Sequence, residues 1–271
     1  MSRLGRRTAI VASASARELT RPLLERRLVF VTGKGGVGKT TISAALALLG
    51  ARAGRRTLVC EVDAKGSLAA AYETGPLTFR PRAVAERLQA MAMNTEDSLR
   101  EYLALQLRMP LLARIRPLAR SLDFVATAAP GVKEILTVGK LCYEVREDHY
   151  DLVVVDAVAT GHIVGQLAAP QAIQELVQVG MVREQTRWML EILDDPDRTG
   201  LVIVTTPEEM PVAETIELAV SLRRRRAEHL AALRDALPRS LPMLFVPELF
   251  ARTSGLRATS QVAEALAEEL G

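Results

Sequence analysis

The chain has 271 residues, of which 49% are hydrophobic, 25% charged and 4% aromatic, and its formal net charge is +3. These values suit one globular domain with a sizeable core, and the dispersed basic excess gives no argument for nucleic acid as a partner. The two cysteines, Cys60 and Cys142, form no C-x-x-C pair, which argues against a disulfide framework or a zinc site. No apolar run reaches the roughly 18 residues of a membrane span. We therefore expect a cytoplasmic protein.

Residues 1–27 are rich in Arg, Ser and Ala and poor in acidic residues. This composition is compatible with a transit peptide. It is equally typical of a loose N-terminal arm that ends in a short helix, and we favour the arm.

Five short apolar runs follow the arm and predict strands, at 27–33, 56–63, 151–157, 200–206 and 242–248. They lack polar alternation, as strands buried on both faces of a parallel sheet do. Helical patterns separate them, so we predict an α/β fold with a mostly parallel, doubly wound sheet flanked by helices. The segment 66–148 interrupts the alternation and predicts a helical insertion that shares the core of a single domain, 28–271.

The first predicted strand runs into a glycine-rich loop that fits the phosphate-binding pattern G-x-x-x-x-G-K-[ST] and precedes a helix. Glycines let the backbone N–H groups of such a loop surround a phosphate, and the helix N-terminus adds its positive dipole end. Lys39 is expected to neutralise the β- and γ-phosphates of ATP, and the Thr40 hydroxyl to bind Mg²⁺. The predicted nucleotide-binding residues are Gly33, Gly35, Gly36, Val37, Gly38, Lys39, Thr40 and Thr41.

Two aspartates end the next apolar runs. Asp63 lies where a carboxylate could orient or deprotonate the attacking water, and we assign it a catalytic role. Asp156 ends "VVVD" in the Walker B arrangement and is the second predicted magnesium ligand, with Thr40. In both cases, an aspartate that merely caps a strand is the simpler alternative.

A second lysine in the loop, Lys34, narrows this interpretation, because the chain has only five lysines. The segment "KGGVGKT" resembles the deviant Walker A motif of the MinD and ParA partition ATPases, the nitrogenase iron protein and the arsenite-pump and tail-anchored-protein-targeting ATPases. The resemblance implies a P-loop NTPase fold and a dimer in which Lys34 reaches the phosphates bound by the partner. Lys34 would then stabilise transition-state charge as an arginine finger does.

Further segments resemble the ArsA, or anion-transporting ATPase, branch of that family, and the resemblance runs from about residue 28 onward. "DAVATGH" (156–162) is similar to its switch II element D-T-A-P-T-G-H, and "VDAKGS" occupies the place of switch I, matching at Asp63. "TTPEEMPVAET" (205–215) is similar to the segment after the next strand. The resemblance implies a Mg²⁺-dependent ATPase that forms a homodimer, or a heterodimer with a related ATPase subunit, and acts on an unknown client or transport partner.

The chain also departs from that branch. It lacks the C-x-x-C pair that binds zinc and the three cysteines that bind arsenite, so we expect neither ligand. Its single asparagine, Asn94, does not lie where the branch has its adenine-binding asparagine, which leaves base selectivity open.

Two other functions stay open beside an ArsA-like ATPase. One is a ParA- or MinD-like positioning ATPase, although the acidic C-terminal segment 259–271 argues against membrane attachment as in MinD. The other is a degenerate regulatory subunit that binds nucleotide weakly. Met- and Leu-rich helices at 91–118 either line an apolar groove for a client or pack as ordinary core, which we favour.

Overall fold

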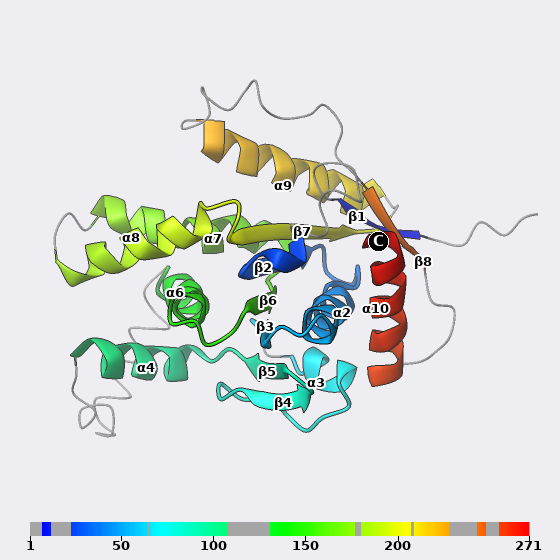
Figure 1. The fold of residues 1–271 in the computed structure, drawn as a ribbon. Helices are drawn as coiled ribbons and strands as arrows, with labels where there is room; N and C mark the ends of the chain where they lie inside the picture. Colours follow the sequence, from blue (N-terminus) through cyan, green and yellow to red (C-terminus); the bar gives the residue numbers. More distant parts are fainter. Residues whose placement is uncertain are drawn as a thin grey trace, which may run out of the picture.

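The computed structural model describes residues 7–11, 23–63, 65–107, 131–176, 180–206, 209–227, 243–247 and 255–270. Within these ranges eight strands form one sheet in the order β4-β5-β3-β6-β2-β7-β1-β8 (Figure 1). The five strands from β5 to β7 are mutually parallel, whereas β4 and β1 run antiparallel to their neighbours. The strands are β1 (Arg7–Val11), β2 (Leu28–Gly33), β3 (Thr57–Glu61), β4 (Arg82–Ala85), β5 (Leu88–Ala92), β6 (Leu152–Asp156), β7 (Thr199–Thr205) and β8 (Met243–Pro247).

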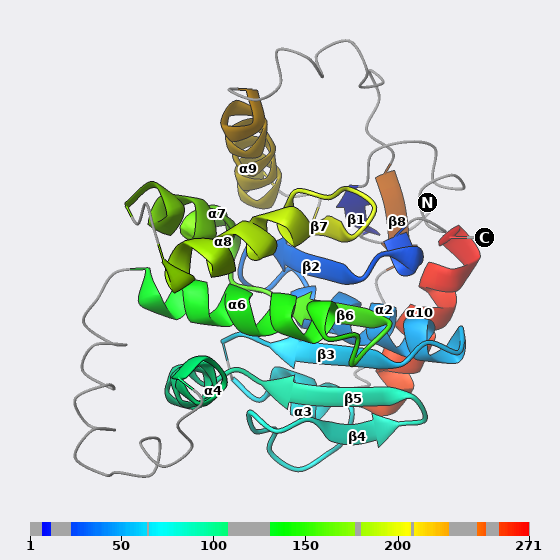
Figure 2. The same cartoon turned by 60° about the vertical axis from the view of Figure 1, so that its left-hand side comes forward.

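Helices cover both faces of this sheet (Figures 1 and 2). On one face α2 packs against β2, β3 and β6 and against α3 and α10, and on the other α6 packs against β6, α7 and α8. Helix α4 lies against α6, and α9 lies against α7 and β7. The helices are α2 (Lys39–Arg52), α3 (Ser67–Ala71), α4 (Thr95–Leu107), α6 (Val132–Arg146), α7 (Thr160–Leu176), α8 (Met181–Leu193), α9 (Glu209–Ala227) and α10 (Leu256–Leu270).

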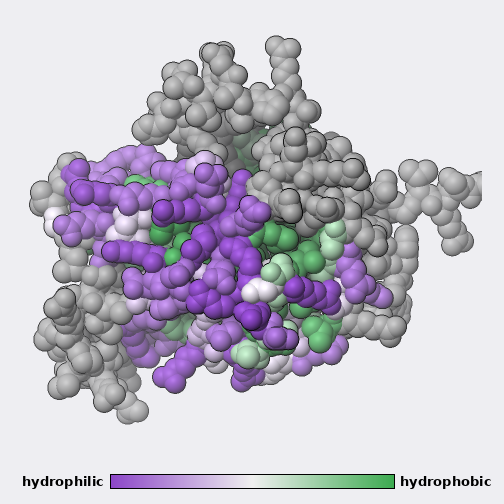
Figure 3. Space-filling view, viewed as in Figure 1, coloured by the Kyte–Doolittle hydropathy of each residue, from purple (hydrophilic) through white to green (hydrophobic). Residues whose placement is uncertain are grey.

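Strand β2 shows why the apolar runs lack polar alternation. Val29 and Val31 belong to the core cluster on the α2 face, and Leu28 and Phe30 to the cluster on the α6 face. Successive side chains of a strand point to opposite faces, so a strand covered on both faces is apolar throughout. On the face seen in Figure 3, hydrophilic residues cover most of the described surface, and hydrophobic residues show mainly near its middle.

The five strands expected from the apolar runs are all present, and the α/β fold with a mostly parallel sheet is confirmed. The segment 66–148, predicted to be mainly helical, also contains strands β4 and β5. β5 pairs with β3 along its whole length, from Thr57↔Leu88 to Glu61↔Ala92, and so extends the parallel sheet. The pattern "LQAMA" carries no β-branched residue, and pairing with β3 decides its conformation.

The predicted arm, 1–27, ends in a short helical segment as expected, but part of it is a strand. Its residues Arg7–Val11 form β1, an antiparallel strand between β7 and β8, and 23–25 are helical. This part of the arm belongs to the sheet because the strand pairs with chain far away in the sequence, which local composition does not reveal. Among the described residues, no helix is long and apolar enough to cross a membrane.

Candidate nucleotide-binding site

The glycine-rich loop joins β2 to α2, as the sequence predicts. Gly36 and Gly38 have φ angles of +85° and +95°, which residues other than glycine rarely adopt. At Gly33 an added Cβ would lie 2.2 Å from the carbonyl oxygen of Val204. The backbone at the end of β2 therefore accommodates only glycine at this position. Val37, by contrast, has a buried side chain in the α2-face core and can contribute only its backbone to a phosphate site.

Helix α2 begins directly after this loop, at Lys39. Its first turn has no acidic residue, and no side chain caps it. The N–H groups at this end and the positive end of the helix dipole are therefore available to an anion. The geometry suits a phosphate group. Thr40 is half-buried and Thr41 is exposed in the same turn.

The Lys39 ammonium lies between the loop and two carboxylates. Its Nζ donates a hydrogen bond to the carbonyl oxygen of Lys34, at 3.2 Å. Burial lowers the pKa of Lys39, and the charges of Asp156 and Asp63 counteract part of that effect. A half-buried ammonium next to backbone N–H groups is suited to neutralising phosphate charge.

Asp156 is the last residue of β6 and pairs in register with Val31 on one side and Glu61 on the other. Its Oδ2 accepts a hydrogen bond from Thr40 Oγ1 at 2.7 Å. Its Oδ1 accepts one from Ser43 Oγ at 3.3 Å. Burial raises the pKa of Asp156 to about 6, although the hydrogen bond from Thr40 lowers it in part. Ser43 is not among the residues predicted from the sequence, although its position one helical turn after Lys39 places it on the same side of α2.

Thr40 and Asp156 together fit a magnesium ion. The hydroxyl and the carboxylate are hard oxygen ligands, and Mg²⁺ in phosphate sites takes its other ligands from phosphates and water. Asp156 is only 6% exposed. Because a buried carboxylate is poorly solvated, a nearby cation stabilises its charged form. These two residues are the ones predicted as metal ligands, and the structure brings them together.

Asp63 lies just beyond β3, at the same edge of the sheet as Asp156. Its side chain is 39% exposed and forms an ion pair with Lys65 at 3.2 Å. The preceding carboxylate, Glu61, is buried and accepts hydrogen bonds from the backbone N–H groups of Gly66 and Ser67, at 3.2 and 2.8 Å. Glu61 thereby fixes the start of α3 and the loop that carries Asp63. Sequence reasoning overlooked this positioning residue.

The loop after Asp156 is tied to β2. The backbone N–H of Ala157 donates to the Val31 carbonyl at 3.0 Å, and Thr32 Oγ1 donates to the Val158 carbonyl at 2.7 Å. Helix α7 starts two residues later, at Thr160. His162, in its first turn, is exposed to solvent.

Lys34 points to a residue of its own chain. Its Nζ lies 3.1 Å from Glu214 Oε1, and Thr160 Oγ1 donates to Glu214 Oε2 at 2.9 Å. The hydrogen bond from Thr160, followed by that from Lys34, lowers the pKa of Glu214. Glu214 of α9 thus connects the phosphate loop to the start of α7. The segment 205–215 contains this glutamate, but its sequence gave no indication of the partner.

Some expectations concern residues outside the described ranges. They include most of the polar segment 223–240, which occupies the place of the family's adenine-binding strand, and residues 108–118 of the Met- and Leu-rich segment. The two cysteines lie in the core on the α6 face, free and buried, and burial raises the pKa of both thiols.

Comparison with known proteins identifies the family of this chain. The family model of the anion-transporting ATPases matches residues 26–185. The chain is 36% identical over 202 residues to ATPase BagA of Mycobacterium tuberculosis, covering 70% of this chain and 59% of the relative. It is 31% identical over 153 residues to ATPase ASNA1 homolog 1 of Paramecium tetraurelia, covering 54% and 44%.

An arsenical pump-driving ATPase of Escherichia coli is 26% identical over 206 residues, which cover 69% of this chain and 35% of that protein. The chain therefore spans less than two thirds of the length of each of these relatives. The family match includes the phosphate loop, Asp63, Asp156 and the start of α7. The chain belongs to the ArsA family of anion-transporting ATPases.

Proposed function

We propose that this chain is a Mg²⁺-dependent ATPase that dimerises around ATP and uses nucleotide state to change the shape of its helical region. The observation that carries the proposal is the 2.7 Å hydrogen bond between Thr40 and Asp156, which are 116 residues apart. It brings the Walker A hydroxyl and the Walker B carboxylate together beside Lys39.

The residues at this edge have separable roles. The loop N–H groups and Lys39 bind the β- and γ-phosphates, and Thr40 with Asp156 would hold Mg²⁺, which supplies positive charge to the phosphates. Asp63 orients the water that attacks the γ-phosphorus. The bond from the γ-phosphorus to the bridging oxygen then breaks, giving ADP and phosphate. Asp63 is suited to this role because its half-exposed carboxylate can reach solvent.

Lys34 is proposed to act in the site of the partner subunit. Its side chain is 30% exposed and extends from the loop surface to Glu214. Reaching a partner's phosphates requires that it leave this glutamate. In the single chain Glu214 is the ion-pair partner of Lys34. Breaking this ion pair would weaken the connection that Glu214 makes between the phosphate loop and the start of α7.

The names of the relatives support hydrolysis, because each is called an ATPase. The arsenical cargo in the name of the Escherichia coli protein is not carried over, since this chain has only two cysteines and both are buried. The partner is a second copy or a related ATPase subunit.

The test of the proposed function starts with Lys34→Ala, and Lys133→Ala on the exposed surface of α6 is its matched control. Removing a charge stabiliser supplied in trans should slow ATP hydrolysis about 1,000-fold. ATP affinity should stay within a few-fold of the original, because Lys39 and the loop are intact. The control variant should retain full activity.

Mixing variants distinguishes action in trans from action in cis. A dimer of one Lys34→Ala subunit and one Lys39→Ala subunit contains one site in which both lysines are present, provided that Lys34 acts on the partner. A statistical mixture should therefore recover about a quarter of the normal activity. If mixed dimers form but recover no activity, Lys34 does not act across the interface. Gel filtration with ADP and with a non-hydrolysable ATP analogue measures dimer formation directly.

A further inference from the structure

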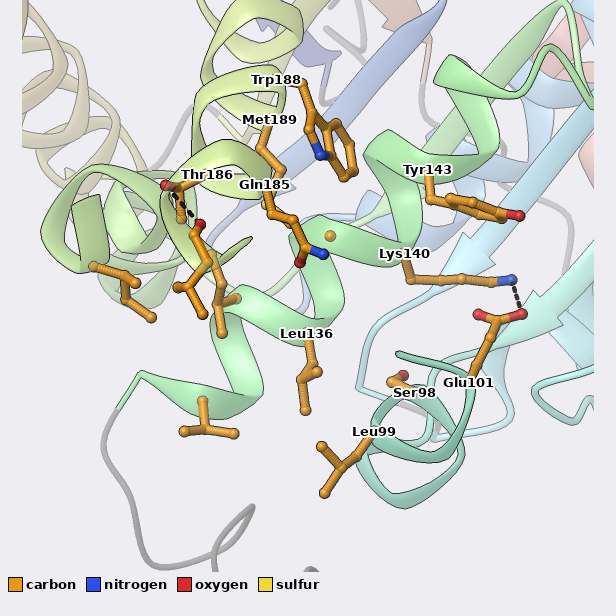
Figure 4. Close-up of a pocket in the computed structure, with 15 residues that line it drawn as sticks. Ser98, Leu99, Glu101, Leu136, Lys140, Tyr143, Gln185, Thr186, Trp188 and Met189 are labelled. Carbon is orange, nitrogen blue, oxygen red and sulfur yellow. Dashed lines mark hydrogen bonds and ion pairs between the residues drawn. The ribbon is translucent and has the colours of Figure 1, made fainter. Parts of the chain in front are cut away.

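A cavity of about 180 Å³ lies among helices α4, α6, α7 and α8, and none of the residues of the nucleotide site lines it (Figure 4). Most of its wall is apolar. Apolar cavities of about 150 Å³ bind molecules of the size of benzene. The main apolar lining residues are Leu99, Val132, Ile135, Leu136, Ile173 and Met189.

One end of the cavity carries charges that already neutralise one another. Lys140 Nζ lies 2.7 Å from Glu101 Oε1 and 2.6 Å from Glu144 Oε1. Burial lowers the pKa of Lys140, but the hydrogen bonds to the two glutamates outweigh it, and the pKa is raised. The ammonium is thus charged and doubly paired. Two carboxylates facing one ammonium disfavour an anionic occupant.

The opposite wall contains a buried amide with unused hydrogen-bonding capacity. Gln185 of α8 is only 7% exposed, and its side chain points into the cavity between Leu136 and Lys140 (Figure 4). Among the residues that the structure describes, none forms a hydrogen bond with this side chain. The amide atoms of Gln185 are not among the fully buried polar atoms that lack a partner, so they line accessible space, where a ligand group can form a hydrogen bond with them.

We propose that this cavity binds a neutral, mainly apolar small molecule that carries one hydrogen-bonding group, which pairs with the Gln185 amide. The volume sets the size at about one substituted ring or a short alkyl chain. The apolar wall contributes most of the affinity, and Gln185 selects for the polar group. The paired charges around Lys140 exclude carboxylates. This site is independent of ATP chemistry.

The chain contains its own reporter for this site. Trp188 is the only tryptophan of the sequence, and it lines the cavity. Its fluorescence can therefore be followed while benzyl alcohol, toluene or benzoate is added to the full chain, and calorimetry gives the same dissociation constants independently. Benzyl alcohol should bind saturably and more tightly than toluene, and benzoate should bind most weakly. Absence of saturable binding of benzyl alcohol by both methods would overturn the proposal.

Gln185→Leu removes the amide at nearly constant volume. It should weaken benzyl alcohol about 5- to 10-fold relative to toluene, as expected for one lost hydrogen bond. Gln171→Leu makes the same change at an exposed position of α7 and should leave both affinities unchanged. Equal preference ratios in the original protein and in Gln185→Leu would show that the amide does not contact the ligand.

A filling variant tests the location independently of the amide. Val132 is half-buried at the cavity wall, where a larger side chain can be accommodated partly toward solvent. Val132→Phe should weaken toluene and benzyl alcohol together, with thermal unfolding confirming that the variant is folded. Unchanged binding of both probes to the folded variant would place the binding site elsewhere.

Discussion

The nucleotide site and the helical cavity use the same sheet in different ways. The nucleotide site is formed at strand ends by glycine backbone and short polar side chains, and its carboxylate Asp156 has both oxygens engaged in hydrogen bonds. The cavity is formed by long side chains from four helices, and its buried amide at Gln185 has no partner among the described residues. The nucleotide site is suited to binding a charged ligand from solvent. The helical cavity is suited to binding a mainly apolar molecule.

The two sites also differ in how far apart their residues lie in the sequence. Eight consecutive residues, 33–40, carry the pattern of the nucleotide site, and Asp156 completes it from the neighbouring strand. The cavity lining is drawn from α4, α6, α7 and α8, spread from residue 98 to 189. A functional site made by backbone conformation is therefore visible in sequence, whereas one made by helix packing is not.

The largest expected effect separates the two regions. Lys39→Ala should reduce ATP hydrolysis about 1,000-fold and weaken nucleotide binding, because among the described residues no other ammonium donates a hydrogen bond to a carbonyl of the loop. Binding of toluene to the cavity should stay unchanged. Steady-state hydrolysis and tryptophan fluorescence on the same preparation measure both. A parallel loss of toluene binding would show that the regions are coupled.

Two leucines of α6 test the packing on the cavity side. Leu141 is fully buried in the core, whereas Leu136 is 8% exposed and lines the cavity. Leu141→Ala should lower the free energy of unfolding by about 2–5 kcal/mol. Leu136→Ala should cost about 1 kcal/mol less, because part of its side chain already faces empty volume. Chemical denaturation measures the difference, and equal losses would contradict the existence of an unfilled cavity.

Asp156 offers a pH-dependent test on the nucleotide side. Because its pKa in the folded protein is about 6, above the usual 3.8, folding favours the protonated form and the charged form destabilises the protein above pH 6. Asp156→Asn should therefore stabilise the nucleotide-free protein by up to about 3 kcal/mol at pH 8 and hardly at pH 4. Thermal unfolding at both pH values measures this, and Mg²⁺-dependent hydrolysis should be lost.

Asp151→Asn is the matched control with the opposite sign. Hydrogen bonds from Arg56 lower the pKa of Asp151 to about 2, so its charged form stabilises the fold above pH 3.8 and that contribution is lost as the pH falls toward 2. The substitution should lower the unfolding temperature at pH 8. If both variants shift stability in the same direction, burial does not set the charge state of Asp156.

The smallest effect is expected at Glu214. Its ion pair with Lys34 is partly exposed, and such pairs contribute little to stability. Glu214→Gln should leave the unfolding temperature nearly unchanged but should favour the nucleotide-dependent dimer, since Lys34 is no longer held by its own chain. Gel filtration across a series of ATP-analogue concentrations measures this. A dimer that forms less readily would mean that Glu214 assists the interface rather than competing with it.

The sequence by itself determined strands β2, β3, β6, β7 and β8, the phosphate loop and the pairing of Thr40 with Asp156. Each is encoded by a local pattern: apolar runs buried on both faces, glycines at conformations that only glycine adopts readily, and a carboxylate at a strand end.

Only the tertiary structure decided the rest. Strands β1 and β5 exist because distant segments complete their hydrogen bonds, and Glu214 acquires its role from Lys34 and Thr160, which no local pattern indicates. The cavity beside Gln185 exists because the side chains of four packed helices leave a volume between them unfilled. Contacts between residues far apart in the chain carry these features, and local propensity holds no information about them.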